Sequence, residues 1–296
     1  MAPKINRRIR FLKLFFLFMA IFIGGCYLFE NWRYFYNKGV KVVSTTPIPR
    51  RFRRVAFSTF IKRYKVDAEE IIDPLESFRT FQEFFVRRVR QRVISRRPGE
   101  LYIPCDAHVT GIRKVDHDEP LTIKSVVYTL KKLLTNTEGS FTSKEITQGM
   151  HNFDEDLYVI SLYLTPGGYH RIHAPDDLRI SSMIHIPGAM FVVNPFRSLM
   201  SKFIKIRLDG NERVVLNAQG TLGKMKMIFV AALGVGGIEL FGTTQFSPAL
   251  TGRFHRELKL GEEMGKFLLG STIVILFSAP KGFEFSVSEG DFVRYG

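Results

Sequence analysis

The sequence predicts an α+β fold, in which one β-rich domain follows N-terminal helices and a transmembrane anchor. Three observations predict it. Beyond residue 100, short β-branched or alternating runs recur between Gly, Pro, Asn and Asp residues. The clearest helix-start signals lie before residue 100, and an uncharged apolar run lies near the N-terminus. With 296 residues, 45% of them hydrophobic, the chain can bury a sizeable core.

The positive charge of the chain is concentrated at its N-terminal end. The formal net charge is +15. Residues 1–65 contain fifteen Lys and Arg residues and a single acid, Glu30, and account for +14 of it, whereas the remaining 231 residues are close to neutral. A nucleic-acid-binding globule carries its basic residues on the folded domain. The distribution therefore favours a membrane partner and no nucleic acid.

Residues 1–30 form the basic segment and the predicted anchor. Sixteen uncharged residues run from Leu14 to Phe29, and residues 11–13 extend the run to nineteen, close to the roughly 20 residues that a spanning helix needs. We therefore expect a single-pass membrane protein. A lipoprotein signal that ends at Cys26 and a short mitochondrial targeting segment are the alternatives. Basic residues flank both sides of the run, so the orientation is left open.

Residues 31–72 are expected to be a basic membrane-proximal linker. Within it, residues 50–65 interleave Arg and Lys with apolar residues at i, i+4 spacing. As a helix, this segment would have an apolar face bordered by basic side chains, which suits an anionic bilayer surface. A solvated basic linker fits the periodicity equally well, and the closeness of the apolar run favours the membrane.

Residues 73–296 are expected to form the folded domain. Asp73 with Pro74, and Thr80 with Glu83, are two helix-start signals, and apolar residues at helical spacing predict one main helix from Phe81 onward. A short helix is expected over 128–134. The expected strands are 157–164, 179–186, 203–208, 213–218, 225–233, 272–277 and 283–287.

Four places in this domain carry residues that could do chemistry. They are Asp106 after an apolar segment, His170 and His173 after a Pro-Gly-Gly turn, the apolar block 188–195, and Ser271 after Gly270 in a hydrophobic stretch. Each alone has a simple structural explanation, such as a turn-forming aspartate. Two histidines three apart also suit a metal, so a metal-dependent membrane hydrolase using His170 and His173 is one hypothesis. The sequence has no obvious third ligand spaced nearby.

In this order, these segments resemble the phosphatidylserine decarboxylase family. The resemblance runs from about residue 78 to the C-terminus and covers 81–88, 162–175, 187–195, 211–214, 235–238 and 261–272, including Leu-Gly-Ser-Thr at 269–272. It implies a carboxy-lyase that converts phosphatidylserine in a bilayer into phosphatidylethanolamine. The apolar N-terminal run resembles the membrane-anchored branch of the family, which implies the mitochondrial inner membrane if the chain is eukaryotic.

The resemblance also implies a proenzyme that cuts itself between Gly270 and Ser271. Ser271 would attack the Gly270 carbonyl, with His173 as the base and Asp106 orienting that base. Residue 271 would then become a pyruvoyl group, a covalent cofactor whose carbonyl forms a Schiff base with the substrate amine. His170 is implied as the acid that protonates the decarboxylated carbon. No metal is implied.

The products would be a β chain, residues 1–270, and an α chain, residues 271–296, which stay together as a heterodimer. One residue departs from the family pattern, which has glycine after the aspartate where this chain has Ala107. If the backbone there needed a positive φ angle, the alanine would be strained. Cys105 is expected to be a small buried side chain.

Overall fold

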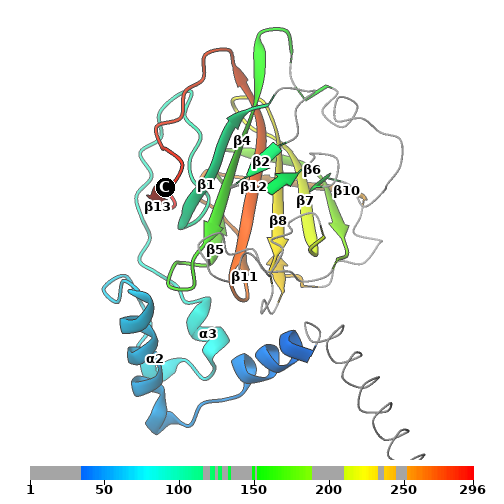
Figure 1. Ribbon diagram of the computed structural model, residues 1–296. Helices are drawn as coiled ribbons and strands as arrows, with labels where there is room; N and C mark the ends of the chain where they lie inside the picture. Colours follow the sequence, from blue (N-terminus) through cyan, green and yellow to red (C-terminus); the bar gives the residue numbers. More distant parts are fainter. Residues whose placement is uncertain are drawn as a thin grey trace, which may run out of the picture.

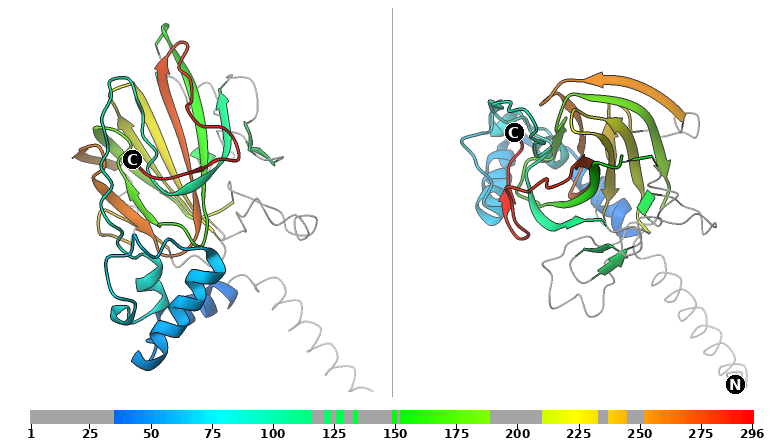
Figure 2. Two further views of the ribbon diagram at one scale, coloured as in Figure 1. Left: turned by 90° about the vertical axis from the view of Figure 1, so that its left-hand side faces the viewer. Right: turned by 90° about the horizontal axis from the view of Figure 1, so that it is seen from above.

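A computed structural model describes residues 35–115, 121–123, 126–128, 133–134, 149–150, 152–188, 210–232, 237–244 and 252–296. Among these residues, the main feature is one curved sheet of eight strands (Figure 1; Figure 2). In spatial order, the strands are β10 (Gly252–Leu258), β6 (Leu178–Ile186), β7 (Arg213–Gln219), β8 (Lys224–Ala231), β12 (Ser271–Pro280), β4 (Glu155–Leu164), β1 (Ala107–Lys114) and β13 (Phe292–Val293). Each neighbouring pair is antiparallel. The expected β-rich domain is confirmed.

Two smaller sheets accompany the large one in the described part of the chain. The first contains β5 (Arg171–His173), β11 (Glu263–Phe267) and β9 (Ile238–Leu240), and the second pairs β2 (Leu121–Ile123) with β3 (Val126–Tyr128). β5 follows β4 along the chain, and β11 precedes β12 by three residues. The three-stranded sheet therefore lies at the end of the large sheet where β12 begins.

Strand β12 lies at the centre of the core. It pairs with β4 on one side and β8 on the other, and its first nine residues are all buried. A strand that is covered on both faces has a continuous apolar run rather than an alternating pattern. The sequence 272–277 shows such a run.

The described helices lie together at one end of the large sheet (Figure 1). Residues 35–45 are helical, and α2 (Arg50–Tyr64), the 3₁₀ turn η1 (Leu75–Ser77) and α3 (Phe81–Phe85) follow. α2 shows that the basic segment 50–65, whose spacing fitted either an amphipathic helix or a solvated linker, is helical over 50–64. An aromatic cluster joins these elements, in which Phe57 of α2 stacks on Phe84 of α3 with 4.6 Å between the ring centroids.

The helix expected from Phe81 onward is shorter than predicted. Its start is correct, because the Thr80 hydroxyl accepts a hydrogen bond from the Glu83 backbone N–H at 3.1 Å. The helix ends after five residues, however, and Val89 forms a β-bridge with Ile71. Tertiary pairing therefore overrides the helical spacing of the later apolar residues.

The predicted transmembrane anchor is the part of the fold class that is wrong. Within the residue ranges given above, no helix is both long enough and apolar enough to cross a membrane. α2 has 15 residues, but six of them are Arg or Lys, whose charges oppose burial in hydrocarbon. The run from Leu14 to Phe29, on which the prediction rested, lies outside the described residues. The residues that the structure describes form a β-rich α+β domain with short N-terminal helices.

Most of the expected strands are confirmed. Segments 157–164, 179–186, 213–218, 225–233 and 272–277 correspond to β4, β6, β7, β8 and β12. Segment 203–208 lies outside the described residues. Segment 283–287 is not a strand, because its aromatic rings pack on Tyr158 and Phe277 as part of a loop. Of the described residues in the expected helix 128–134, residues 133 and 134 are helical and residue 128 ends β3.

Gly265 in β11 provides a test of this packing. A methyl group added there would lie 2.1 Å from the Glu239 carbonyl oxygen and 2.9 Å from the Leu240 Cα atom of β9, and backbone atoms cannot move aside as a flexible side chain can. We expect Gly265→Ala to lower the free energy of unfolding by about 2 kcal/mol, measured by urea denaturation. Gly39→Ala is the matched control, because nothing lies within 4 Å of its added methyl group. An equal loss in both variants would contradict the prediction.

Candidate active site

The blocks that the sequence analysis singled out meet at one end of the large sheet. Ser271, the first residue of β12, pairs with Leu164 at the end of β4 and with Ala231 at the end of β8. The loop after Leu164 leads directly to His170, whose carbonyl accepts a hydrogen bond from the Phe267 backbone N–H at 2.9 Å. Strand pairing therefore brings the Gly-Ser step next to the segment that carries both histidines.

Ser271 has a buried hydroxyl group. The residue is fully buried, and its Oγ atom makes no hydrogen bond with any residue that the structure describes. A methyl group added at the preceding Gly270 would lie 3.7 Å from the Leu164 carbonyl oxygen, an ordinary contact. A buried hydroxyl without a partner costs about 1–3 kcal/mol, and such groups mark sites where a polar atom is kept for chemistry.

His170 is a buried, neutral histidine. Its Nδ1 atom lies 3.0 Å from the Gly168 carbonyl oxygen, so Nδ1 carries the proton and donates it. Its Nε2 atom is then an acceptor, and it has no partner among the described residues. Burial lowers the pKa of His170 to about 3, and the positive charge of Arg87 acts in the same direction. The ring lies 4.0 Å from that of Phe85, so an apolar wall covers it.

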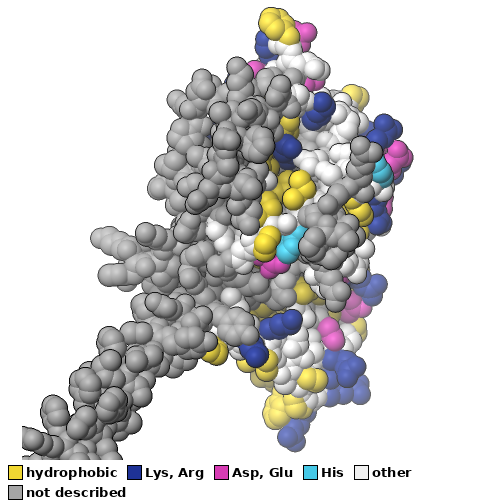
Figure 3. Space-filling model, turned by 90° about the vertical axis from the view of Figure 1, so that its right-hand side faces the viewer, with side chains coloured by type: hydrophobic (Ala, Val, Ile, Leu, Met, Phe, Trp, Pro, Cys, Tyr) yellow, Lys and Arg dark blue, Asp and Glu magenta, His cyan; other side chains and the backbone are white. Residues whose placement is uncertain are grey.

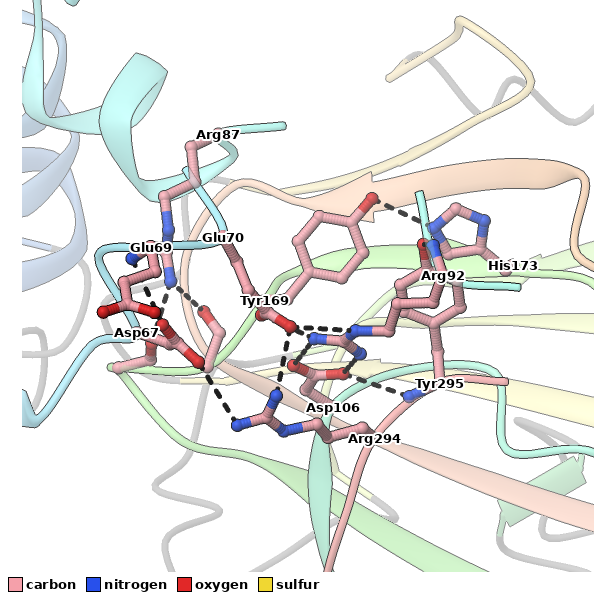
Figure 4. A network of polar contacts seen from close by, with 12 residues as sticks. Asp67, Glu69, Glu70, Arg87, Arg92, Asp106, Tyr169, His173, Arg294 and Tyr295 are labelled. Carbon is pink, nitrogen blue, oxygen red and sulfur yellow. Dashed lines mark hydrogen bonds and ion pairs between the residues drawn. The ribbon is translucent and has the colours of Figure 1, made fainter. Parts of the chain in front are cut away.

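His173 is held on both ring nitrogens and on one face (Figure 4). Nδ1 donates to the Gly261 carbonyl oxygen at 2.9 Å, which leaves Nε2 to accept from the Tyr169 hydroxyl at 3.0 Å. The Tyr295 ring stacks on the imidazole with 4.1 Å between centroids and 8° between planes. Burial lowers the pKa of His173, so the ring is neutral at neutral pH and its basic atom is Nε2.

Asp106 is bound to an arginine rather than to a histidine. Arg92 donates to its two carboxylate oxygens at 2.6 and 3.0 Å, and the Tyr295 backbone N–H donates to it at 3.0 Å. Arg92 also donates to Glu70. The structure thus places Asp106 and His173 in one network, but it links them through Tyr295 and not by a direct hydrogen bond (Figure 4). The expected relay of Ser271, His173 and Asp106 stays a prediction.

Several residues of this network were not predicted. They are Glu70, Arg92, Tyr169, Arg294 and Tyr295. Arg294 forms an ion pair with Glu70 at 3.0 Å and another with Asp67 at 3.4 Å. Tyr169 precedes His170 directly and could have been found from that position, whereas the other four residues carry no local signal. The C-terminal segment therefore forms part of the wall around His173.

Two neighbours of Asp106 show how the site backbone is built. Ala107 is the first residue of β1 and is not among the non-glycine residues with positive φ, so the strain considered for this alanine does not arise. Cys105 is fully buried, as expected, and burial raises the pKa of its thiol. In the described part of the chain, no three His, Cys, Asp or Glu side chains lie together in a way that could hold a metal ion.

Comparisons with known proteins point in one direction. One family model, described as phosphatidylserine decarboxylase, matches residues 81–296. A phosphatidylserine decarboxylase proenzyme from Methylibium petroleiphilum is 34% identical over 266 residues, which cover 85% of each chain. A proenzyme of the same name from Escherichia coli is 33% identical over 243 residues, 77% of this chain and 71% of the relative. The mitochondrial proenzyme from Pongo abelii is 30% identical over 283 residues, 84% of this chain and 67% of the relative.

The stacking of Tyr295 on His173 leads to a measurable prediction. Because burial holds the pKa of His173 below its usual 6.5, opening one face of the ring to water raises it. We expect the His173 pKa, followed by NMR titration of the ring protons, to rise toward the usual value in Tyr295→Leu. Tyr295→Phe keeps the aromatic ring and is expected to leave the pKa low. An unchanged pKa in the leucine variant would show that the stack does not shield the imidazole.

Proposed function

The chain belongs to the phosphatidylserine decarboxylase family, whose members are carboxy-lyases, and from this premise we propose that it is a self-processing proenzyme acting on phosphatidylserine. The product would be phosphatidylethanolamine. The observation that carries the proposal is the buried, unpartnered hydroxyl of Ser271, which follows Gly270 beside two buried histidines. The family membership supports this function and not a metal-dependent hydrolase that uses the two histidines.

The first proposed step is self-cleavage. Ser271 Oγ attacks the carbonyl carbon of Gly270, so that an ester C–O bond forms and the peptide C–N bond to residue 271 breaks. The hydroxyl proton passes to a base and then to the released amine. The ester then eliminates: residue 271 loses its Cα proton to a base, its Cβ–Oγ bond breaks, and the products are a carboxyl group on Gly270 and a dehydroalanine at residue 271. This enamine takes up a proton at Cβ to become an imine, and hydrolysis of the imine by water releases ammonia. Residue 271 is then the pyruvoyl group.

We assign His173 as the base of this step. Its tautomer places the lone pair on Nε2, and burial keeps the ring neutral and able to accept a proton. The Tyr169 hydroxyl occupies Nε2 in this structure, so it has to turn away before the proton can move. Asp106 contributes through its negative charge, which favours the protonated imidazole. Its position also depends on Arg92 and Tyr295.

Residue 271 suits a pyruvoyl group. Its side-chain oxygen is buried and makes no hydrogen bond with a described residue, so passing this oxygen to the carboxyl group of Gly270 breaks no hydrogen bond. The new carbonyl takes the place of the backbone nitrogen of residue 271. When formed, the group supplies an electron-accepting carbonyl for the loss of carbon dioxide. We assign His170 as the residue that brings a proton to the carbon left behind. Its Nε2 atom is an unprotonated acceptor without a partner among the described residues, so it first takes up a proton that the substrate ammonium group loses when the amine reacts, and then passes this proton to the carbon.

The two products of cleavage are proposed to remain one heterodimer. The α chain, 271–296, would keep β12 between β4 and β8 of the β chain. β13 would keep its pairing with β1, and Arg294 its ion pairs. The cut at Gly270 lies before residues 272–280, so the pairing of these residues does not depend on the peptide bond that is broken.

The membrane surface is the proposed partner that presents the lipid. α2 exposes Phe52 and Val55, and its sequence places basic residues beside them. Figure 3 shows Lys and Arg side chains next to hydrophobic ones at the helical end of the molecule. Each basic residue near an anionic surface contributes about 1 kcal/mol of attraction. If the chain is eukaryotic, the mitochondrial relative favours the mitochondrial inner membrane as the location.

Replacement of Ser271 tests the proposed cleavage. Denaturing mass analysis of the purified protein is expected to show a fragment of residues 271–296 whose N-terminus is blocked by the pyruvoyl group. Ser271→Ala removes the nucleophile and is expected to stay uncut. Thr272→Ser is the control, because it changes a neighbouring hydroxyl residue and leaves Ser271 in place. An uncut wild-type chain with full activity would refute the proposal.

Replacement of each histidine separates the two assigned roles. We expect His173→Gln to slow the appearance of the short fragment about 100-fold, since the serine loses its base. We expect His170→Gln to be cut normally and to release carbon dioxide from phosphatidylserine about 100-fold more slowly. Cleavage is followed by mass analysis and decarboxylation by trapped carbon dioxide. If His170→Gln blocked cleavage and His173→Gln did not, the roles would be reversed.

A further inference from the structure

Arg87 has a buried guanidinium group with unused donors. The residue is 4% exposed. Its Nη2 atom donates to the Gly167 and Gly168 carbonyl oxygens at 2.9 and 3.2 Å. Its Nε and Nη1 atoms are buried and have no hydrogen-bond partner among the described residues. Buried N–H donors of a charged group that lack an acceptor destabilise the folded protein. Such donors call for an explanation, and a ligand that accepts their hydrogen bonds is one.

The acids near Arg87 are bound by other arginines. Asp106 is paired with Arg92 at 2.6 Å, and Glu70 with Arg92 and Arg294 at 2.8 and 3.0 Å. Asp67 is paired with Arg294. Burial lowers the pKa of Arg87 to about 10, so it remains a cation at neutral pH. In the part of the chain that the structure describes, this cation has no carboxylate within ion-pair distance.

Arg87 lines a cavity beside the candidate active site. The cavity has a volume of about 430 Å³, and Lys65, Thr165, Tyr169 and Asp106 also contribute to its wall. The same wall includes Gly167 and Gly168, the residues that lead to His170. Figure 4 shows the Arg87 side chain extending toward the acidic residues of the network. Asp67 and Glu70 line the cavity as well, together with the Arg294 that pairs with them. An anion in this cavity would therefore lie against Arg87 and the turn that leads to His170.

We propose that Arg87 and this cavity bind an anionic oxygen of the substrate head group. The guanidinium fork suits a phosphate or a carboxylate, and phosphatidylserine carries both. This inference rests on the proposed function for the identity of the lipid. A bound anion would also offset the charge of Arg87, which opposes protonation of His170. Binding of substrate and readiness of His170 to carry a proton would then be linked.

Equilibrium binding of two soluble probes to the full chain tests the proposal. Glycerophosphoglycerol has the phosphodiester but neither carboxylate nor amine, and N-acetylserine has the carboxylate but neither phosphate nor free amine. We expect wild-type protein to bind at least one probe, and Arg87→Gln to weaken that binding about tenfold or more. The probe whose binding is weakened in Arg87→Gln shows whether Arg87 binds the phosphate or the carboxylate. Arg88→Gln is the matched control, since Arg88 is exposed and paired with Asp73.

A second measurement uses wild-type protein and so does not depend on the variant folding. The Nε–H resonance of Arg87 is expected to shift on saturation with the same probe. Failure of both probes to bind, an equal loss in Arg88→Gln, or an Arg87 resonance that does not move would overturn the inference. None of these measurements needs cleavage or turnover. A chain that binds the probe through Arg87 but never cuts itself would refute the proposed function and leave the anion site standing.

Discussion

The pairing of β12 with β4 and β8 is the constraint on which the other features depend. Each residue of β12 has a partner in β4, and this register fixes Ser271 opposite Leu164. The segment that carries His170 and His173 begins one residue later. The same strand leads through the C-terminal segment to Tyr295, which reaches Asp106 and His173. One strand thus positions Ser271, the proposed nucleophile, and indirectly the groups around His173, its proposed base.

Most charged side chains of the site belong to one network of ion pairs, and Arg87 lies outside these pairs. In the network, Arg92 and Arg294 bind the three carboxylates of Glu70, Asp67 and Asp106, while both histidines are held neutral by burial. Removing one member of a largely buried pair such as Arg92–Asp106 typically costs about 3–5 kcal/mol, whereas the half-exposed pairs of Arg294 contribute less. Together these pairs connect the N-terminal, central and C-terminal segments. Among the residues that the structure describes, Arg87 makes no ion pair with any of these carboxylates.

The sequence predicted the structure best where a pattern lies within one continuous stretch of residues. The long strands β4, β6, β7, β8 and β12 each carry enough apolar residues to be recognised, and the Gly-Ser step and the two histidines lie in short motifs. β5, β9, β11 and β13 have two to five residues each, too few for a period to be read. The bonds of Asp106 to Arg92 and of Asp106 to Tyr295 span 14 and 189 residues. Contacts between residues so far apart in the sequence leave no local pattern. The same holds for the end of α3, because the residues after it pair with a different segment through the bridge between Val89 and Ile71.

The place of Tyr295 has a consequence for biosynthesis. The aromatic face that covers His173, and one of the hydrogen bonds that hold Asp106, come from a residue that is added 24 residues after Ser271. A nascent chain that ends before residue 295 lacks both contacts. The surroundings of His173 are therefore completed by almost the last residue to be synthesised.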